Sequence, residues 1–169
     1  VNAAGWVLIV YRFGLTPQGA AGVFIFSLAL VITQIDLKHY LIPNSLVLVL
    51  LGAGIGYYFF EPGPGIINRL IGLAVGFVIP LVLGYLSKGG MGGGDIKLMG
   101  AMGFWLGFPG VLYSLFIAAL VGSIIGILMI AAGIRKRKDP IPFGPFLVLG
   151  FLCIFFFRDM FILYYWNFF

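Results

Sequence analysis

The chain has 169 residues, of which 62% are hydrophobic and only 9% are charged, and its mean hydropathy is +1.16. A soluble globular domain is nearer half apolar and a quarter charged, so this composition excludes an ordinary soluble domain and indicates a protein embedded in a lipid bilayer. The net charge of +5 does not indicate nucleic acid binding, because the basic residues lie between apolar runs, where they orient a membrane protein.

Seven apolar segments follow in chain order, and each is a candidate membrane-spanning helix, which needs roughly 20 mainly apolar residues. They cover residues 3–14, 19–36, 41–60, 66–86, 96–108, 110–133 and 142–157. The first and the fifth are short. We therefore predict an all-α fold, a transmembrane helix bundle of six or seven spans that forms one membrane-embedded domain over residues 1–169.

The basic residues predict the orientation of this bundle, since Lys and Arg are enriched in cytoplasmic loops. With alternating crossings, one side of the membrane receives Lys38, Lys88, Lys97 and the run from Arg135 to Lys138. The other side receives Arg12, Arg69 and Arg158. We predict that the first side is the cytoplasmic one.

Small residues give a prediction about packing. Glycines four residues apart occur at Gly52 and Gly56, Gly72 and Gly76, Gly103 and Gly107, and Gly122 and Gly126. This spacing lets helix backbones approach closely in lipid, so we interpret the pairs as contacts within one chain, with a homodimer as the alternative. The single cysteine, Cys153, lies in an apolar run and is interpreted as an apolar filler.

Two of the five acidic residues stand out by their positions. Asp36 ends the apolar stretch "LALVITQID", with Thr33 one turn earlier on the same helix face. Asp95 follows "GGMGGG" and begins the next apolar segment. Alternating crossings bring both acids to the cytoplasmic boundary, and acids at membrane depth tend to mark functional sites. The alternatives are pairing with Lys38 for Asp36 and helix capping for Asp95.

A pair of close carboxylates predicts hydrolytic chemistry. The two groups cannot both ionise easily, so one keeps a proton that the other lacks. The charged group can take a proton from water as the water attacks an amide carbonyl, while the protonated group donates towards the carbonyl oxygen. Asp36 and Asp95 are thus predicted to be catalytic, without metal or cofactor. Gly92, Gly93 and Gly94 are predicted to form a cytoplasmic-side loop that lets a substrate backbone approach and acts as a hinge.

Three stretches in this order resemble the type IV prepilin peptidase family of membrane GxGD aspartyl proteases: "DLKHYLIPN" from Asp36, "GGGDIKLM" from Gly92, and "PIPFGPFLVLG" at 140–150. The resemblance implies that Asp36 and Asp95 are the catalytic pair. It also implies that leader peptides of type IV prepilins or pseudopilins are removed at the cytoplasmic face of a bacterial inner membrane, and that the products serve pili or type II secretion.

Many members of that family also carry a zinc-binding region with Cys-x-x-Cys pairs, which methylates the new N-terminus with S-adenosylmethionine. This chain has one cysteine and no such pair, so the resemblance implies the catalytic portion without that region, as a minimal relative or as part of a longer chain, and it does not extend to methylation.

Further candidates are less specific. Lys97 is a candidate for stabilising a carboxylate or contacting substrate, and its alternative is a lysine that reaches towards the headgroups. Phe143 and Gly144, in the third stretch, are candidates for facing the substrate. The only histidine, His39, is predicted to be solvated.

Two other functions compete with the protease. A presenilin-like protease shares GxGD but predicts a tyrosine where Ile35 stands and a Pro-Ala-Leu stretch where this sequence has "PFGP". A transporter or proton-coupled carrier would use Asp36 and Asp95 as proton relays, which predicts acids near the middle of the bilayer rather than at segment ends.

Overall fold

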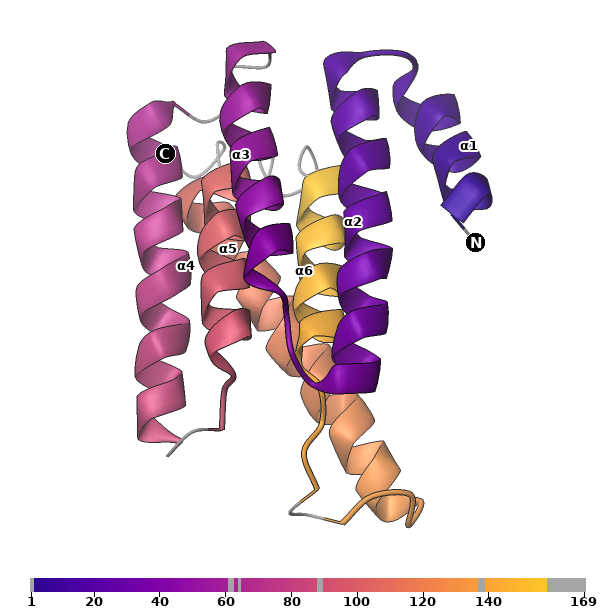
Figure 1. Ribbon diagram of the computed structural model, residues 1–169, viewed down its shortest axis with the longest axis vertical. Helices are drawn as coiled ribbons and strands as arrows, with labels where there is room; N and C mark the ends of the chain where they lie inside the picture. The colour runs from indigo at the N-terminus through magenta and orange to yellow at the C-terminus, as the bar shows by residue number, and fades with distance from the viewer. Residues whose placement is uncertain (1, 61–62, 64, 88–89, 137–138, 158–169) are drawn as a thin grey trace, which may run out of the picture.

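The computed structural model describes residues 2–60, 63, 65–87, 90–136 and 139–157. This part of the chain contains helices and no strand, as predicted: α1 (Asn2–Phe13), α2 (Pro17–His39), α3 (Asn44–Phe60), α4 (Ile66–Leu86), α5 (Gly93–Ala131) and α6 (Gly144–Phe156). Figure 1 shows the helices side by side in a bundle, with α1 at one edge against α2.

The helix boundaries follow the predicted segments, and three helices have the length of a membrane span. α2, α4 and α5 are long and apolar enough to cross a membrane, whereas α3 and α6 are shorter apolar helices. The number of helices that cross the bilayer stays a prediction.

Local signals set the ends of α2. The Thr16 hydroxyl accepts the Gly19 N–H at 3.1 Å, and Pro17 begins the helix. Tyr40 ends the helix in the left-handed conformation, at φ 54°.

The helix α5 is broken at Gly107, and the break reverses the chain. Gly107 has φ 75° and ψ −179°, a combination that is essentially restricted to glycine. Before the break α5 packs on α4, where Gly76 faces Met99; beyond it α5 packs on α6, where Gly122 faces Phe146. In Figure 1 the chain runs up beside α4 and then down past α6. The predicted segments 96–108 and 110–133 are therefore two helical segments joined without a loop.

Two polar side chains of α4 satisfy the backbone at this break. Asn68 accepts the Phe108 N–H at 2.7 Å, and the Arg69 guanidinium donates to the Phe104 carbonyl at 3.4 Å. Arg69 is fully buried, and it also lies 5.4 Å from the centre of the Tyr58 ring. Backbone groups at a helix break lose their intrahelical partners, and lipid offers none, so these contacts make the reversal possible within the bundle.

Most of the spaced glycines pack helices of the same chain, as we interpreted. A β-carbon on Gly72, Gly76 or Gly103 would overlap backbone atoms of the facing helix, and one on Gly122 would lie 3.1 Å from the Phe146 ring. Gly52 and Gly56 differ, because a β-carbon there would meet nothing within 4 Å. The homodimer stays untested.

The described basic residues group at the two ends of the bundle as predicted. At one end, the Lys97 ammonium donates to the Asn44 side chain at 2.9 Å, and the Arg135 guanidinium donates to the Tyr40 hydroxyl at 3.0 Å. Lys38 and Lys136 share this end, and Arg12 and Arg69 lie towards the opposite one. Lys88, Arg137, Lys138 and Arg158 lie outside the described residues.

Replacing Gly107 by alanine tests the break. We expect Gly107→Ala to lower the free energy of unfolding in detergent micelles by about 1–3 kcal/mol, because a side chain is strained at this φ and ψ. The matched control is Gly52→Ala, which places a methyl group in open space inside α3 and is expected to leave stability unchanged or to raise it by up to about 1 kcal/mol. An equal loss in both variants would contradict this account.

Candidate active site

Asp36 lies at the end of the bundle where α2 ends and α6 begins. It is the fourth residue from the end of α2 and exposes only 4% of its surface. Its Oδ2 atom accepts the backbone N–H of Gly144, the first residue of α6, at 2.9 Å. The first N–H groups of a helix have no intrahelical partner and carry a partial positive charge, so this helix start is a suitable partner for a buried carboxylate.

Asp95 lies in the first turn of α5 and is half-buried. Its Oδ2 atom accepts the backbone N–H of Gly92 at 3.2 Å. This is the carboxylate half of a capping box, and Gly92 has no side chain to complete the other half. The capping alternative for Asp95 is therefore present. The hydrogen bond from Gly92 still leaves the Asp95 carboxylate able to accept other hydrogen bonds, because a carboxylate offers about four lone-pair sites.

The two acids are brought together through Ile42. A β-carbon on Gly144 would lie 3.2 Å from the Cδ1 atom of Ile42, and one on Gly94 would lie 2.9 Å from its Cβ atom. The buried Ile42 side chain thus lies between the residue that binds Asp36 and the residue that precedes Asp95. Asp36 and Asp95 are thus linked through a short chain of contacts, from Asp36 to Gly144, Ile42 and Gly94. Two predicted catalytic residues from different helices therefore share one end of the bundle.

The pairing alternative for Asp36 is not observed, since the described residues include no ion pair between Asp36 and Lys38, and Lys38 is exposed. Lys97 is also exposed, and its ammonium contacts Asn44, so it joins the start of α5 to the start of α3. Among the described side chains Lys97 forms no ion pair with Asp95. His39 is exposed, as predicted.

The other third-stretch candidates have structural contacts. Phe143 is half-buried, and its ring packs against that of Phe146 with centroids 6.3 Å apart. Gly144, predicted to face the substrate, has a contact that sequence reasoning missed, the donation to Asp36. No sequence signal identifies this bond, because it joins residues on two distant helices.

The predicted glycine loop is shorter than expected. α5 begins at Gly93, so Gly93 and Gly94 belong to its first turn and only residues 87–92 connect it to α4. Gly94 approaches Ile42 closely, whereas a β-carbon on Gly93 would meet nothing within 4 Å. The lack of a side chain at Gly94 is therefore needed for helix packing beside Asp95.

The fold and the site together define a class: an apolar helical membrane protein with two neighbouring carboxylates at one end of its bundle. A model of the type IV leader peptidase family matches residues 23–127, a range that includes both Asp36 and Asp95. The chain belongs to this family, which confirms the resemblance found in its sequence.

Named relatives agree with the family. The chain is 35% identical over 159 residues to the prepilin leader peptidase/N-methyltransferase of Xanthomonas campestris pv. campestris, with 89% of this chain and 54% of that protein covered. The protein of the same name from Bacillus subtilis is 29% identical over 91% of this chain and 62% of its own length. That from Pseudomonas aeruginosa is 31% identical, over 84% and 51%. The chain thus spans little more than half the length of these relatives, and no solved structure matches it.

Adjacent glycines at the site are expected to respond differently to alanine. Gly94→Ala should lower the free energy of unfolding by about 1–3 kcal/mol, because its methyl group would press on Ile42. Gly93→Ala is the matched control, one residue away in the same helical turn, and should cause no loss. Thermal unfolding in detergent compares the two, and a loss in Gly93→Ala as large as that in Gly94→Ala would contradict the packing role.

Proposed function

We propose that this chain is an aspartic-type endopeptidase that removes the leader peptides of type IV prepilins or pseudopilins. The observation that carries the proposal is the position of Asp36 and Asp95 at the same end of the bundle, with Ile42 packed between Gly144, which binds Asp36, and Gly94, which precedes Asp95. Membership of the type IV leader peptidase family and the names of the relatives support this substrate class.

The proposed reaction uses the two carboxylates as one acid–base unit. The ionised carboxylate takes a proton from a water molecule, the oxygen of which attacks the carbonyl carbon of the scissile peptide bond. The protonated carboxyl group donates to the carbonyl oxygen, giving a tetrahedral intermediate. Return of a proton to the amide nitrogen breaks the carbon–nitrogen bond and releases a new carboxyl end and a new amine. The shared proton belongs to the pair rather than to Asp36 or Asp95 alone.

The distribution of charge supports a cytoplasmic location for this site. The acid end of the bundle carries Lys38, Lys97, Arg135 and Lys136, and basic residues mark the cytoplasmic side of membrane proteins. We therefore propose that the acids face the cytoplasm from a bacterial inner membrane. The carrier alternative is less well supported, since both acids lie near helix ends and not in a broken helix at mid-membrane.

Removing either charge tests the mechanism. Asp36→Asn and Asp95→Asn should each reduce cleavage of a leader-bearing prepilin peptide by at least about a thousandfold, because loss of one member of a catalytic unit removes most of its rate enhancement. Cleavage is measured in detergent by mass spectrometry of the two products.

The control for this experiment is Asp139→Asn. Asp139 accepts the Lys136 N–H at 2.8 Å in the loop before α6, so it is an acid outside the proposed pair. This variant should cleave at nearly the wild-type rate. Substantial cleavage by Asp36→Asn or by Asp95→Asn, in a protein that is still folded, would remove that residue from the mechanism.

Gly144 tests how the pair is positioned. A β-carbon at this position would lie 2.6 Å from Oδ2 of Asp36, so Gly144→Ala must displace the carboxylate. A displacement of the order of 1 Å in a catalytic group costs on the order of a hundredfold in rate, so kcat should fall strongly while KM changes little. A rise in KM at unchanged kcat would show that Gly144 acts on substrate binding and not on Asp36.

A further inference from the structure

A short connection between α2 and α3, residues 40–43, passes beside the start of α5 without forming regular secondary structure. Ile42 of this connection is buried, and a β-carbon on Gly94 would lie 2.9 Å from its Cβ atom and 3.2 Å from its backbone nitrogen. The Lys97 ammonium donates to the side chain of Asn44, the first residue of α3, at 2.9 Å. The start of α5 therefore holds the connection at two points.

The two points lie on the same face of α5. Gly94 and Lys97 are three residues apart, so they are neighbours on the helix surface, and Asp95 directly follows Gly94. The packing at Gly94 alone would hold only Ile42 and would let the connection turn about that contact. The hydrogen bond from Lys97 also fixes the place where α3 begins.

α5 is the more rigid partner in these contacts. A β-carbon on Gly76 of α4 would overlap the Met99 carbonyl oxygen, so α4 and the first half of α5 meet backbone to backbone. Deeper in the bundle, the Trp105 indole N–H donates to the Leu50 carbonyl of α3 at 2.8 Å. Loss of a contact between α5 and the connection should therefore displace the connection and not α5.

The connection leads directly to Asp36. The Tyr40 N–H donates to the Asp36 carbonyl at 2.9 Å, and Ile42 packs on Gly144, which binds the Asp36 carboxylate. The Arg135 guanidinium donates to the Tyr40 hydroxyl at 3.0 Å and to a carbonyl in the loop before α6 at 3.4 Å. Arg135 thus holds the connection to the side of Asp36, and Lys97 holds it to the helix of Asp95.

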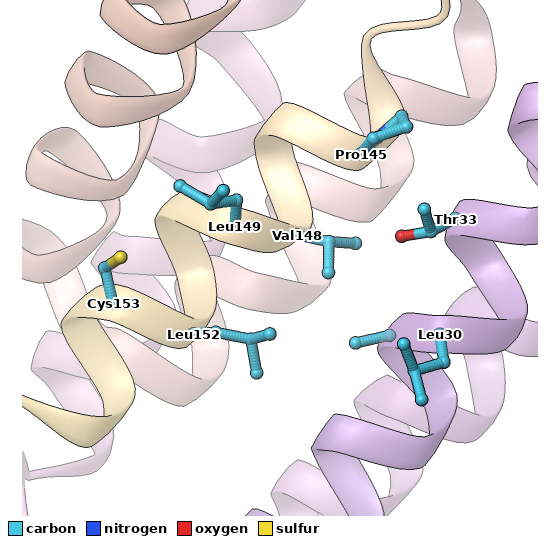
Figure 2. Close-up of a pocket in the computed structure, with 8 residues that line it drawn as sticks. Leu30, Thr33, Pro145, Val148, Leu149, Leu152 and Cys153 are labelled. Atoms are coloured by element: carbon cyan, nitrogen blue, oxygen red, sulfur yellow. The ribbon is translucent and has the colours of Figure 1, made fainter. Parts of the chain in front are cut away.

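The packing of α2 on α6 does not replace this support. A pocket of about 240 Å³ lies between these helices, and Figure 2 shows Thr33 of α2 facing Val148 of α6 across it. Its walls are almost wholly apolar, and neither acid of the proposed pair lines it. Because the two helices do not fill this space, the position of Asp36 depends more on the contacts at the helix ends.

We propose that Lys97 is a positioning residue that acts through Asn44. Its hydrogen bond holds the connection between α2 and α3 against α5, and the connection sets where Asp36 lies relative to Asp95. This inference rests on the proposed peptidase function and assigns Lys97 a role in it that needs no contact with substrate or with the reacting groups.

Removing either end of the hydrogen bond tests this role. Lys97→Met and Asn44→Leu should each lower kcat for a leader-bearing prepilin peptide by about tenfold and leave KM near the wild-type value, since a displacement of part of an ångström in a catalytic group has an effect of this order. The double variant should be no slower than either single variant, because both remove the same contact. Lys97→Arg keeps a donor and should retain most of the activity. Exposed contacts of charged side chains add little to stability, so these variants are expected to fold.

The matched control is Lys38→Met. Lys38 follows Asp36 by two residues, as Lys97 follows Asp95, and it is also exposed. Within the described ranges its side chain forms no hydrogen bond or ion pair. This variant removes the same charge at the same end of the bundle without breaking a contact, and it should behave as wild type.

A spectroscopic readout follows Asp36 without catalysis. The Gly144 N–H donates to the Asp36 carboxylate, so its amide resonance, in protein labelled at glycine nitrogen and held in micelles, reports where that carboxylate lies. This resonance should move in Lys97→Met and in Asn44→Leu, although neither residue is near Gly144 in the sequence. It should stay in place in Lys38→Met, although Lys38 is close to Asp36.

The remaining outcomes separate the two proposals. Unchanged kcat in both variants would overturn the positioning role, and so would a loss in Lys97→Met without one in Asn44→Leu, which would show direct action of Lys97 on substrate or on a carboxylate. A rise in KM at unchanged kcat would show substrate binding instead. An unmoved Gly144 resonance in both variants overturns the positioning role whether or not the protein cleaves prepilin. If wild type cleaves no prepilin and the resonance moves, the peptidase proposal fails and the link from Lys97 to Asp36 stands.

Discussion

A buried carboxylate needs a polar partner, and the site depends on how Asp36 obtains one. An ionisable group in an apolar bundle is costly unless hydrogen bonds compensate, and the N–H of Gly144 supplies such a bond at 2.9 Å. This contact fixes the start of α6 against the end of α2. Ile42 packs beside this contact, against both Gly144 and Gly94. Without it, α6 would lose a polar attachment to the acid end.

The reversal at Gly107 makes this contact possible. As one straight helix, α5 would extend for about 58 Å, and this is nearly twice the hydrocarbon thickness of a bilayer, about 30 Å. The break lets the chain leave the acid end in the first half of α5 and come back to it in the second half, so that α6 starts beside Asp36. Asn68 and Arg69 satisfy the backbone that the break exposes. A polar cluster at one end of the bundle therefore supports the geometry of the site at the other.

Much of this arrangement was predictable from the sequence, because apolar runs indicate helices in the bilayer and basic residues indicate which ends of those helices share one side of the membrane. They gave the helices nearly at their true boundaries and placed Asp36 and Asp95 at one end. The gap expected at residue 109 is close to the break, and Pro109 near the start of a helical segment is a usual signal. The positive φ of Gly107 was not predictable, because glycine adopts many conformations. The contacts of Gly144 with Asp36 and of Lys97 with Asn44 were not predictable either, because they depend on how helices that are distant in the sequence pack together.

The glycines show why composition alone misassigned part of the site. A glycine-rich stretch before an acid indicates a flexible loop, yet Gly94 is helical and gives space to Ile42. Gly144 meets a similar constraint, because a side chain there would displace Asp36. At both positions the absence of a β-carbon lets one helix start lie against another segment. Asp36 and Asp95 are therefore held at the same end of the bundle by the packing of helix ends.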